Sequence, residues 1–242
     1  MRPEHDAECD ETVVAEVEPV SSSVTASEHA AAAKETVMDQ TATSWSPEVF
    51  TDHFVTAVHE VFKASSGLTN REWTRNVLKA TTLASQRTAQ QIAHPSNRPV
   101  SLTARYHGAT NLMKEVKATT PELSQLKIEG RSHVPALDLA ITDQSGRRHI
   151  IAEPEQGGAR DRANDDMKLV SIDEGEIAIS VYRPTSDTDA KSAEKAARGR
   201  LEKRHSPSVA VGIQIPKGGK MSDYKIVGLD RINFTSVKTS DL

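Results

Sequence analysis

Two glutamates separated by a single residue stand at the end of an apolar stretch in the middle of the chain. In HIIAEPEQGG, residues 149–158, Glu153 and Glu155 flank Pro154 and precede a pair of glycines. A further carboxylate, Asp138, lies in the preceding apolar stretch VPALDLAIT. Alternate residues of a β-strand share one face of a sheet, so Glu153 and Glu155 should lie together. Pairing of the two stretches can bring Asp138 beside them.

Carboxylates held this close repel one another, so such a group usually shares a proton or holds a cation. Hard oxygen ligands suit Mg²⁺, which is typically bound by one or two carboxylates, several waters and a substrate phosphate. The metal supplies a nucleophilic water and offsets charge on a phosphate, as hydrolysis of a phosphodiester requires. The pattern therefore indicates Mg²⁺-dependent phosphodiester hydrolysis. A solvated, charged end of a sheet without a ligand is the alternative, because Glu-x-Glu alone is a weak pattern.

A predicted hairpin positions these acids. VPALDLAIT, residues 134–142, and RRHIIAEPE, residues 147–155, alternate as strands and are joined by the turn DQSG. In the first strand Leu137 and Leu139 should point to one side of the sheet and Asp138 to the other. The hairpin should therefore carry acids on both arms.

The second half of the chain continues the sheet. Residues 159–171 have apolar residues at helical spacing, and residues 175–182 alternate as a strand, which makes a βαβ unit with parallel strands. A basic helix over 191–204 and strands at 208–215 and 224–234 follow. We predict an α/β fold with a mixed central β-sheet flanked by helices.

The segment before the hairpin is predicted to be helical. Ser46 and Pro47 form an N-cap and first-turn proline, followed by apolar residues at helical spacing. A second helix is expected over 71–92 and a third around 102–118, with Leu112 on its buried face.

Charge separates the chain into a tail and a body. Residues 1–45 hold ten Asp and Glu residues against one Arg and one Lys. This segment therefore carries −8, and the rest of the chain +4, since the whole chain carries −4. We expect 1–45 to be an acidic, disordered tail and 46–242 a single domain, helical over 46–120 and with an α/β core over 121–242.

Cysteine content argues against a disulfide-stabilised or Cys-based zinc protein, and hydropathy argues against a secreted or membrane-spanning one. The single cysteine, Cys9, cannot form a disulfide framework or a Cys-based zinc site. No secretory signal pattern and no apolar run long enough to span a bilayer is apparent. We expect a soluble, cytoplasmic protein with no membrane partner.

The order of motifs resembles a known nuclease core. Asp, turn, apolar strand, Glu-x-(Lys/Glu/Gln), helix and strand is the order of the PD-(D/E)XK nucleases. More narrowly, EPEQGGARDRANDDMKLVSIDEGEIAISVYRP is similar to the segment after the catalytic strand in type II restriction endonucleases of the BamHI/BglII kind. The likeness covers roughly residues 110–215 and is best over 134–184. It implies a restriction-endonuclease-like core that cleaves double-stranded DNA sequence-specifically with Mg²⁺.

The resemblance also implies roles for individual acids. Asp138 and Glu153 match the metal ligands of these enzymes. Glu155 falls where most of the superfamily has lysine but BamHI-like enzymes have glutamate, so it would orient or deprotonate the attacking water. An upstream acid contributes in some relatives, and Glu115 and Glu122 are both candidates for it.

Pro154 departs from the family pattern. Proline lacks the N–H that a central strand donates, so it predicts a bulge, an edge or a distorted strand end. Such a distortion would displace Glu155 and weaken or abolish activity.

DNA contacts are expected from the helix after the catalytic strand. Arg160, Arg162 and Lys168 suit phosphates or guanine edges, and Asn164 stands where the resembling enzymes place base-contacting side chains. A solvated helix face is the alternative for each. A palindromic target implies a C2 homodimer, with the helices before the hairpin as the expected interface. A restriction enzyme also implies a cognate DNA methyltransferase, on which the sequence is silent.

Two other functions stay open. A catalytically inactive nuclease-fold protein that binds DNA or a partner is favoured by Pro154. A glycoside hydrolase also uses two carboxylates, but they must flank the glycosidic bond, and adjacent acids on one strand fit that poorly. Aromatic residues make up only 4% of the chain, which leaves few platforms for sugar stacking.

Overall fold

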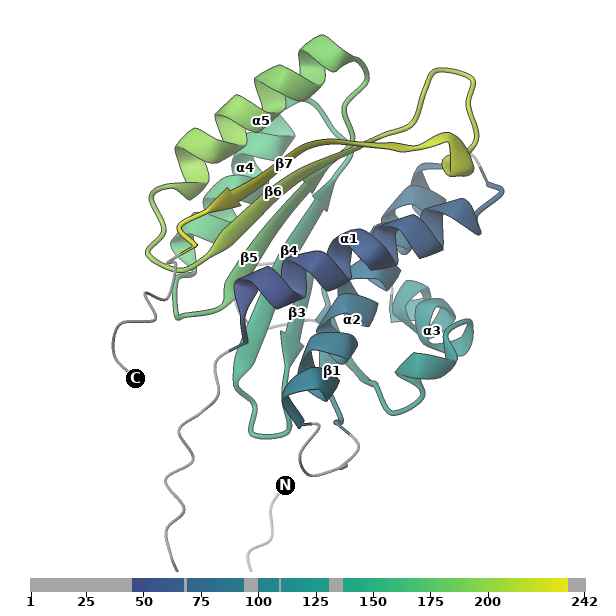
Figure 1. Ribbon diagram of the computed structural model, residues 1–242, viewed down its shortest axis with the longest axis vertical. Coiled ribbons are helices and arrows are strands. Elements are labelled where there is room, and N and C mark those ends of the chain that lie inside the picture. The colour runs from purple at the N-terminus through teal and green to yellow at the C-terminus, as the bar shows by residue number, and fades with distance from the viewer. Residues whose placement is uncertain (1–44, 68, 94–99, 109, 131–136, 235–242) are drawn as a thin grey trace, which may run out of the picture. The chain divides into compact units, whose positions relative to one another are not determined.

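The computed structural model describes residues 45–67, 69–93, 100–108, 110–130 and 137–234 (Figure 1). The expected disordered tail, 1–45, lies outside the described residues except for Trp45. The described residues belong to one compact unit.

A seven-stranded mixed sheet forms the centre of this unit. In spatial order the strands are β2 (Lys127–Glu129), β1 (Thr103–Tyr106), β3 (Leu139–Thr142), β4 (Arg148–Glu155), β5 (Ile177–Tyr182), β6 (Ser208–Gln214) and β7 (Lys225–Ile232). β1 pairs parallel with β2 and antiparallel with β3, and β3 pairs antiparallel with β4. β4, β5 and β6 run parallel, and β7 closes the sheet antiparallel to β6. The predicted α/β class and the hairpin are confirmed.

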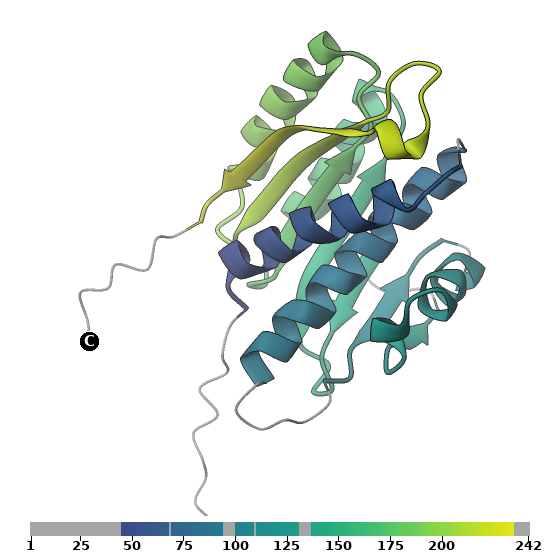
Figure 2. The same cartoon turned by 45° about the vertical axis from the view of Figure 1, so that its right-hand side comes forward.

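Helices cover both faces of the sheet. Figures 1 and 2 show α1 and α2 side by side on one face, and α4 and α5 on the other. The helices are α1 (Pro47–Lys63), α2 (Asn70–Ala93), α3 (Thr110–Ala118), α4 (Ala159–Ser171) and α5 (Asp187–Leu201), with short 3-10 turns η2 (Pro121–Leu123) and η3 (Met221–Asp223). In the described part of the chain, no helix is both long and apolar enough to span a membrane.

The predicted start of the first helix is confirmed. Ser46 caps α1, because its Oγ accepts a hydrogen bond from the Val49 backbone N–H at 3.2 Å, and Pro47 occupies the first turn. Phe50 and Phe54 are fully buried on the inner face. This face packs α1 against α2 and the sheet.

The predicted helix over 102–118 is wrong in its first part, and so is an all-helical 46–120. Residues 103–106 form β1, which pairs with β3. Ala104 and Tyr106 are buried while Arg105 between them is exposed, which is the period of a strand. The helix begins only at Thr110, and Leu112 lies on its buried face as expected.

The sheet separates two apolar cores, and alternation along β4 decides which core each residue joins. Ile150 and Ala152 pack in the larger core, with residues of α1 and α2. Ile151 packs in the smaller core, with Leu169 and other residues of α4 and α5. From Ile151 onward, the odd-numbered residues of β4 therefore face α4. Glu153 and Glu155 share that face.

Leu137 does not share a face with Leu139 as predicted. Leu137 packs in the smaller core and Leu139 in the larger one. β3 begins only at Leu139, and Asp138 stands in a bend before it. The alternation of strand residues therefore does not extend back to Leu137 and Asp138.

Candidate active site

The hairpin brings Asp138 and Glu153 together. β3 and β4 pair as far as Leu139 opposite Ala152. Next to this pair, the backbone N–H of Asp138, which precedes Leu139, donates to Oε1 of Glu153, which follows Ala152. The distance is 3.0 Å. The bend at Asp138 is held from its other side by the His107 N–H, which donates to the Asp138 carbonyl at 3.1 Å.

Glu153 is a buried carboxylate. Its residue is only 1% exposed, and it faces α4 beside Ser180 of β5. Burial, and then the charge of Asp138, raise the pKa of Glu153 to about 8. Burial also raises the pKa of Asp138. The two acids thus form a site in which a cation would relieve a real electrostatic cost.

Helix α4 adds a cation and another acid. Lys168 Nζ donates to Asp165 Oδ1 at 2.6 Å and to Glu153 Oε2 at 3.3 Å. Burial lowers the pKa of Lys168, but the hydrogen bond to Asp165 and the charge of Glu153 outweigh it and raise the pKa overall. Lys168, predicted to contact DNA, lies among the acids. We call Asp138, Glu153, Glu155 and Asp165 the acidic cluster.

Glu155 joins the acidic cluster through Asp165. Burial, and then a hydrogen bond with Asp165, raise the pKa of Glu155 to about 7. The Gly157 N–H also donates to its carboxylate. A Cβ on Gly157 would lie 2.7 Å from Glu155 Oε1 and 2.5 Å from Asp161 Oδ2, so a larger residue here would push both carboxylates out of their present positions.

Pro154 stands at a local edge of the sheet. β4 keeps unbroken register with β5, with Pro154 opposite Val181 and Glu155 opposite Tyr182. Pairing with β3 has already stopped at Ala152. The Glu155 carbonyl points toward β5, because it accepts from the Arg183 N–H. Backbone groups of successive strand residues point to opposite sides, so the nitrogen of Pro154 points away from β5, toward the side where β3 would lie. Since β3 does not extend this far, no hydrogen bond is lost there. The edge predicted from Pro154 is present, and Glu155 keeps its place in the strand.

Buried polar contacts anchor α4 on the sheet. Asp166 is 1% exposed, accepts from Ser180 Oγ at 2.6 Å, and pairs with Arg200 of α5 at 2.6 Å. These two contacts fix the rotation of α4 about its own axis. With this rotation, the neighbouring Asp165 points toward the other acids of the acidic cluster. Sequence reasoning missed Asp165; the only signal for it was the pair of aspartates in RANDDMK.

The remaining predicted DNA contacts divide into two kinds. Arg162 pairs with Asp189 of α5 at 2.7 Å and is largely covered, which favours a structural role. Arg160 and Asn164 are exposed, and at a spacing of four residues they share one face of α4. Met167 continues this face and is 47% exposed.

The two candidates for an upstream acid pair elsewhere. Glu115 of α3 forms an ion pair with Arg71 of α2. Glu122 of η2 pairs with Arg87 of α2 at 3.0 Å, and Arg87 also binds Glu60. The additional acid beside Glu153 is Asp165, from a helix downstream of the hairpin.

Within the described residues, no three His, Cys, Asp or Glu side chains are already arranged to hold a metal ion. Comparison with known proteins finds no matching family model, no matching curated protein and no matching solved structure. The resemblance to restriction endonucleases therefore stays a prediction from the order of motifs in the sequence.

The raised pKa of Glu153 predicts a pH-dependent stability in metal-free protein. Between about pH 4.5 and 8 the folded state keeps a proton that the unfolded chain releases, so the free energy of unfolding should fall as pH rises through this window. Glu153→Gln should remove part of this fall. Urea unfolding with a chelator across this range measures both proteins. An identical pH dependence in the two would contradict the prediction.

Proposed function

We propose that this protein is a Mg²⁺-dependent endonuclease that hydrolyses phosphodiester bonds of double-stranded DNA at specific sites. The observation that carries the proposal is the buried Glu153 beside Asp138, with Lys168 at the same point, on a strand–turn–strand–helix unit. A carboxylate whose pKa is strongly raised by burial and by a neighbouring charge is typical of sites tuned for chemistry.

Asp138 and Glu153 would hold the Mg²⁺. Two carboxylates suffice, because Mg²⁺ usually keeps several waters and takes a substrate phosphate as a further ligand. The bound ion would supply positive charge at the scissile phosphate and a more acidic water. Displacement of Lys168 from Glu153 would accompany its entry.

Glu155 is suited to accept the proton of the attacking water. A general base works best when its pKa is near the working pH, and that of Glu155 is about 7. Asp165, hydrogen-bonded to it, would orient it. Lys168 would offset negative charge that develops on the phosphate.

DNA would approach along the exposed face of α4. Arg160 and Asn164 point to solvent there, next to the strand end that carries Glu153. Arginine and asparagine can form bidentate hydrogen bonds with base edges in the major groove. A homodimer would place two such helices on a palindromic site.

A second function is favoured by the contacts of Lys168. Its ammonium already pairs with Glu153 and Asp165, so the same fold would be stable as a DNA-binding protein without a metal and without cleavage.

The purified protein, incubated with large unmethylated DNA and Mg²⁺ beside a chelator control, tests the proposal. Discrete fragments that require the metal would support a site-specific nuclease. Retarded but intact DNA across several divalent metals would favour the binding protein instead, and DNA that is neither bound nor cut would refute both.

Lys168→Met should slow cleavage by about 10²-fold, as expected for loss of one positioned charge in the transition state. Mg²⁺ binding should not weaken, because the variant removes a cation that competes for Glu153. Single-turnover cleavage and calorimetric Mg²⁺ titration separate the two effects. Lys191→Met, an exposed lysine on α5, is the matched control and should cleave normally. Weaker metal binding by Lys168→Met would argue that Lys168 only holds the fold.

A further inference from the structure

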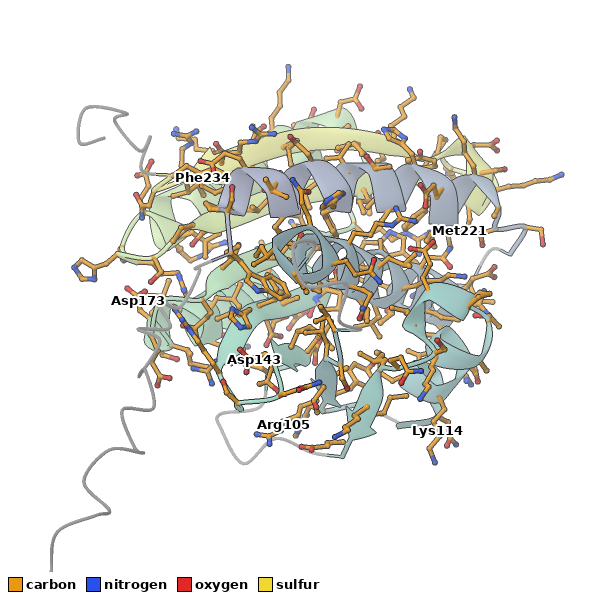
Figure 3. The ribbon with its side chains drawn as sticks, turned by 60° about the horizontal axis from the view of Figure 1, so that its bottom comes forward. Arg105, Lys114, Asp143, Asp173, Met221 and Phe234 are labelled. Carbon is orange, nitrogen blue, oxygen red and sulfur yellow. The ribbon has the colours of Figure 1, made fainter. Side chains whose placement is uncertain are left out.

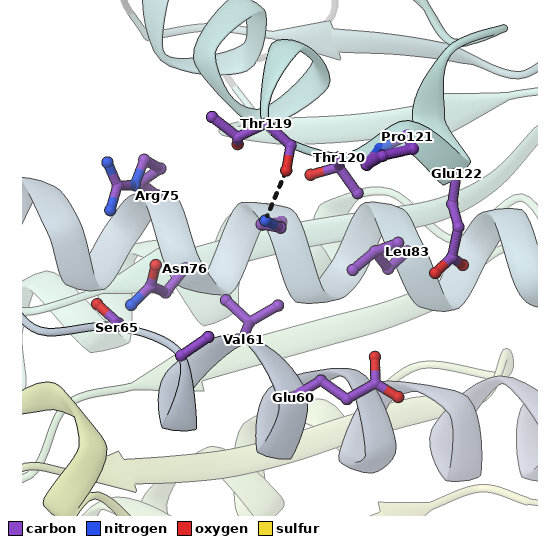
Figure 4. A pocket seen from close by; sticks show the side chains of 12 residues that line it. Glu60, Val61, Ser65, Arg75, Asn76, Leu83, Thr119, Thr120, Pro121 and Glu122 are labelled. Carbon is purple, nitrogen blue, oxygen red and sulfur yellow. Dashed lines mark hydrogen bonds between the residues drawn. The ribbon is translucent and has the colours of Figure 1, made fainter.

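A separate pocket lies between α1, α2 and the segment that follows α3 (Figure 4). Its volume is about 340 Å³, enough for a small organic molecule. Its walls combine apolar and polar groups. Its lining includes Asn76, Lys79, Leu83, Thr120, Pro121 and Val61.

Two residues that line this pocket each carry a buried polar atom with no partner among the described residues. These atoms are Asn76 Nδ2 and Thr120 Oγ1. The two residues are only 3% and 5% exposed. A buried donor without an acceptor is costly, typically about 1–3 kcal/mol, so most such groups have a partner in the functioning protein. Both atoms can donate to a ligand in the pocket.

Lys79 adds a positive charge to the same wall. Lys79 follows Asn76 by three residues and Arg75 by four on α2, so it neighbours both on the helix surface. Lys79 Nζ donates to the Thr119 carbonyl at 3.2 Å, the bond marked in Figure 4, and no carboxylate of the described residues pairs with it. Burial and the charge of Arg75 lower the pKa of Lys79, as expected for a cation that lacks a counter-charge.

The two acids of the pocket share one arginine as their partner. Glu60 and Glu122 stand at its other end, and the Arg87 guanidinium binds both, at 2.8 and 3.0 Å. Their repulsion of an anion at the Lys79 end is therefore reduced. The groups of the pocket that lack a counter-charge or a hydrogen-bond partner are the ammonium of Lys79, the amide N–H of Asn76 and the hydroxyl of Thr120. All three can donate hydrogen bonds to an anion.

We propose that this pocket binds a small organic phosphate, with its phosphate oxygens accepting from Lys79, Asn76 and Thr120. Three donors from different side chains match the several acceptor oxygens of a phosphate better than the two of a carboxylate. Val61, Leu83 and Pro121 offer apolar contacts to the rest of the molecule. The site uses none of the acidic cluster and is independent of nuclease activity.

Calorimetric titration of the full chain with glycerol phosphate, and separately with inorganic phosphate, tests the site. The wild type should bind saturably. Lys79→Gln and Asn76→Leu should each weaken binding about tenfold or more, as for loss of a hydrogen bond to a charged group. Lys79→Arg should restore most of the affinity by keeping the charge. Circular dichroism confirms that each variant is folded.

The matched control is Lys114→Gln. Lys114 lies on α3 and projects to solvent (Figure 3), so its loss should leave binding unchanged. Absence of saturable binding by the wild type would overturn the proposal. Equal affinity in wild type and Lys79→Gln would also overturn it, because the phosphate would then occupy another site, such as the DNA-binding face of α4. Neither result bears on Mg²⁺-dependent cleavage.

Discussion

Glu153→Gln should abolish Mg²⁺-dependent DNA cleavage, with a loss of about 10³-fold or more, because charge stabilisation by a catalytic metal is worth several kcal/mol. The substitution keeps the shape and the hydrogen bond to the Asp138 N–H but removes the negative charge that would hold the metal. Cleavage of unmethylated DNA, followed on gels with Mg²⁺ in excess, measures the effect. DNA binding without metal should persist.

The fold should survive this change, which makes the result interpretable. The Glu153 carboxyl has a pKa of about 8 in the absence of a metal, so the folded protein already holds it largely uncharged at neutral pH. The neutral glutamine is therefore expected to be at least as stable near neutral pH as the wild type. Glu202→Gln, at an exposed position, is the control and should cleave like the wild type. Full activity in Glu153→Gln would exclude Glu153 as a metal ligand.

The acids on the hairpin could be predicted from sequence because their placement depends on local rules. Strand alternation places Glu153 and Glu155 on one face, and a short turn brings the preceding arm alongside. Asp138 therefore had to lie near Glu153. Pro154 could also be interpreted locally, since its missing N–H requires a position without a partner strand.

The contribution of α4 could not be predicted in the same way. Which face of a helix meets a sheet depends on tertiary contacts, here the buried bonds of Asp166 to Ser180 and Arg200. These contacts direct Asp165 and Lys168 inward. Residue type alone made Lys168 a DNA contact. The ion pairs of Glu115 and Glu122 with α2 are equally long-range and have no sequence signature.

The strand over 103–106 was missed for another physical reason. Its four residues are too few to establish a period of two, and they directly precede a real helical pattern. Pairing with β3 on one side and β2 on the other decides the local structure. Tertiary context overrides propensity in such a short segment.

Arg204→Ala should destabilise the protein by about 3–5 kcal/mol, the range for removing one partner of a buried charged network. The Arg204 side chain is fully buried and donates to the carbonyls of Leu169, Ile172 and Glu176. Two of these carbonyls lie at the end of α4; that of Leu169 also accepts from the Ile172 N–H, and that of Ile172 lies beyond the last helical residue. Urea unfolding at neutral pH measures the loss. Lys203→Ala, at the exposed neighbouring position, should change stability by less than about 0.5 kcal/mol.

This arginine connects the stability of the fold to the candidate active site. By binding three carbonyls, Arg204 fixes the end of α4 and the turn into β5. The last two turns of the same helix carry Asp165 and Lys168. Arg204→Lys keeps the charge, but the lysine ammonium lacks the planar fork with which arginine reaches three carbonyls. This variant should therefore recover only part of the stability that Arg204→Ala loses. If α4 is the element that presents Lys168 to Glu153, Arg204→Lys should also slow cleavage at temperatures where it remains folded. Unchanged cleavage by a destabilised Arg204→Lys would instead show that β4 and β5 alone hold the acidic cluster in place.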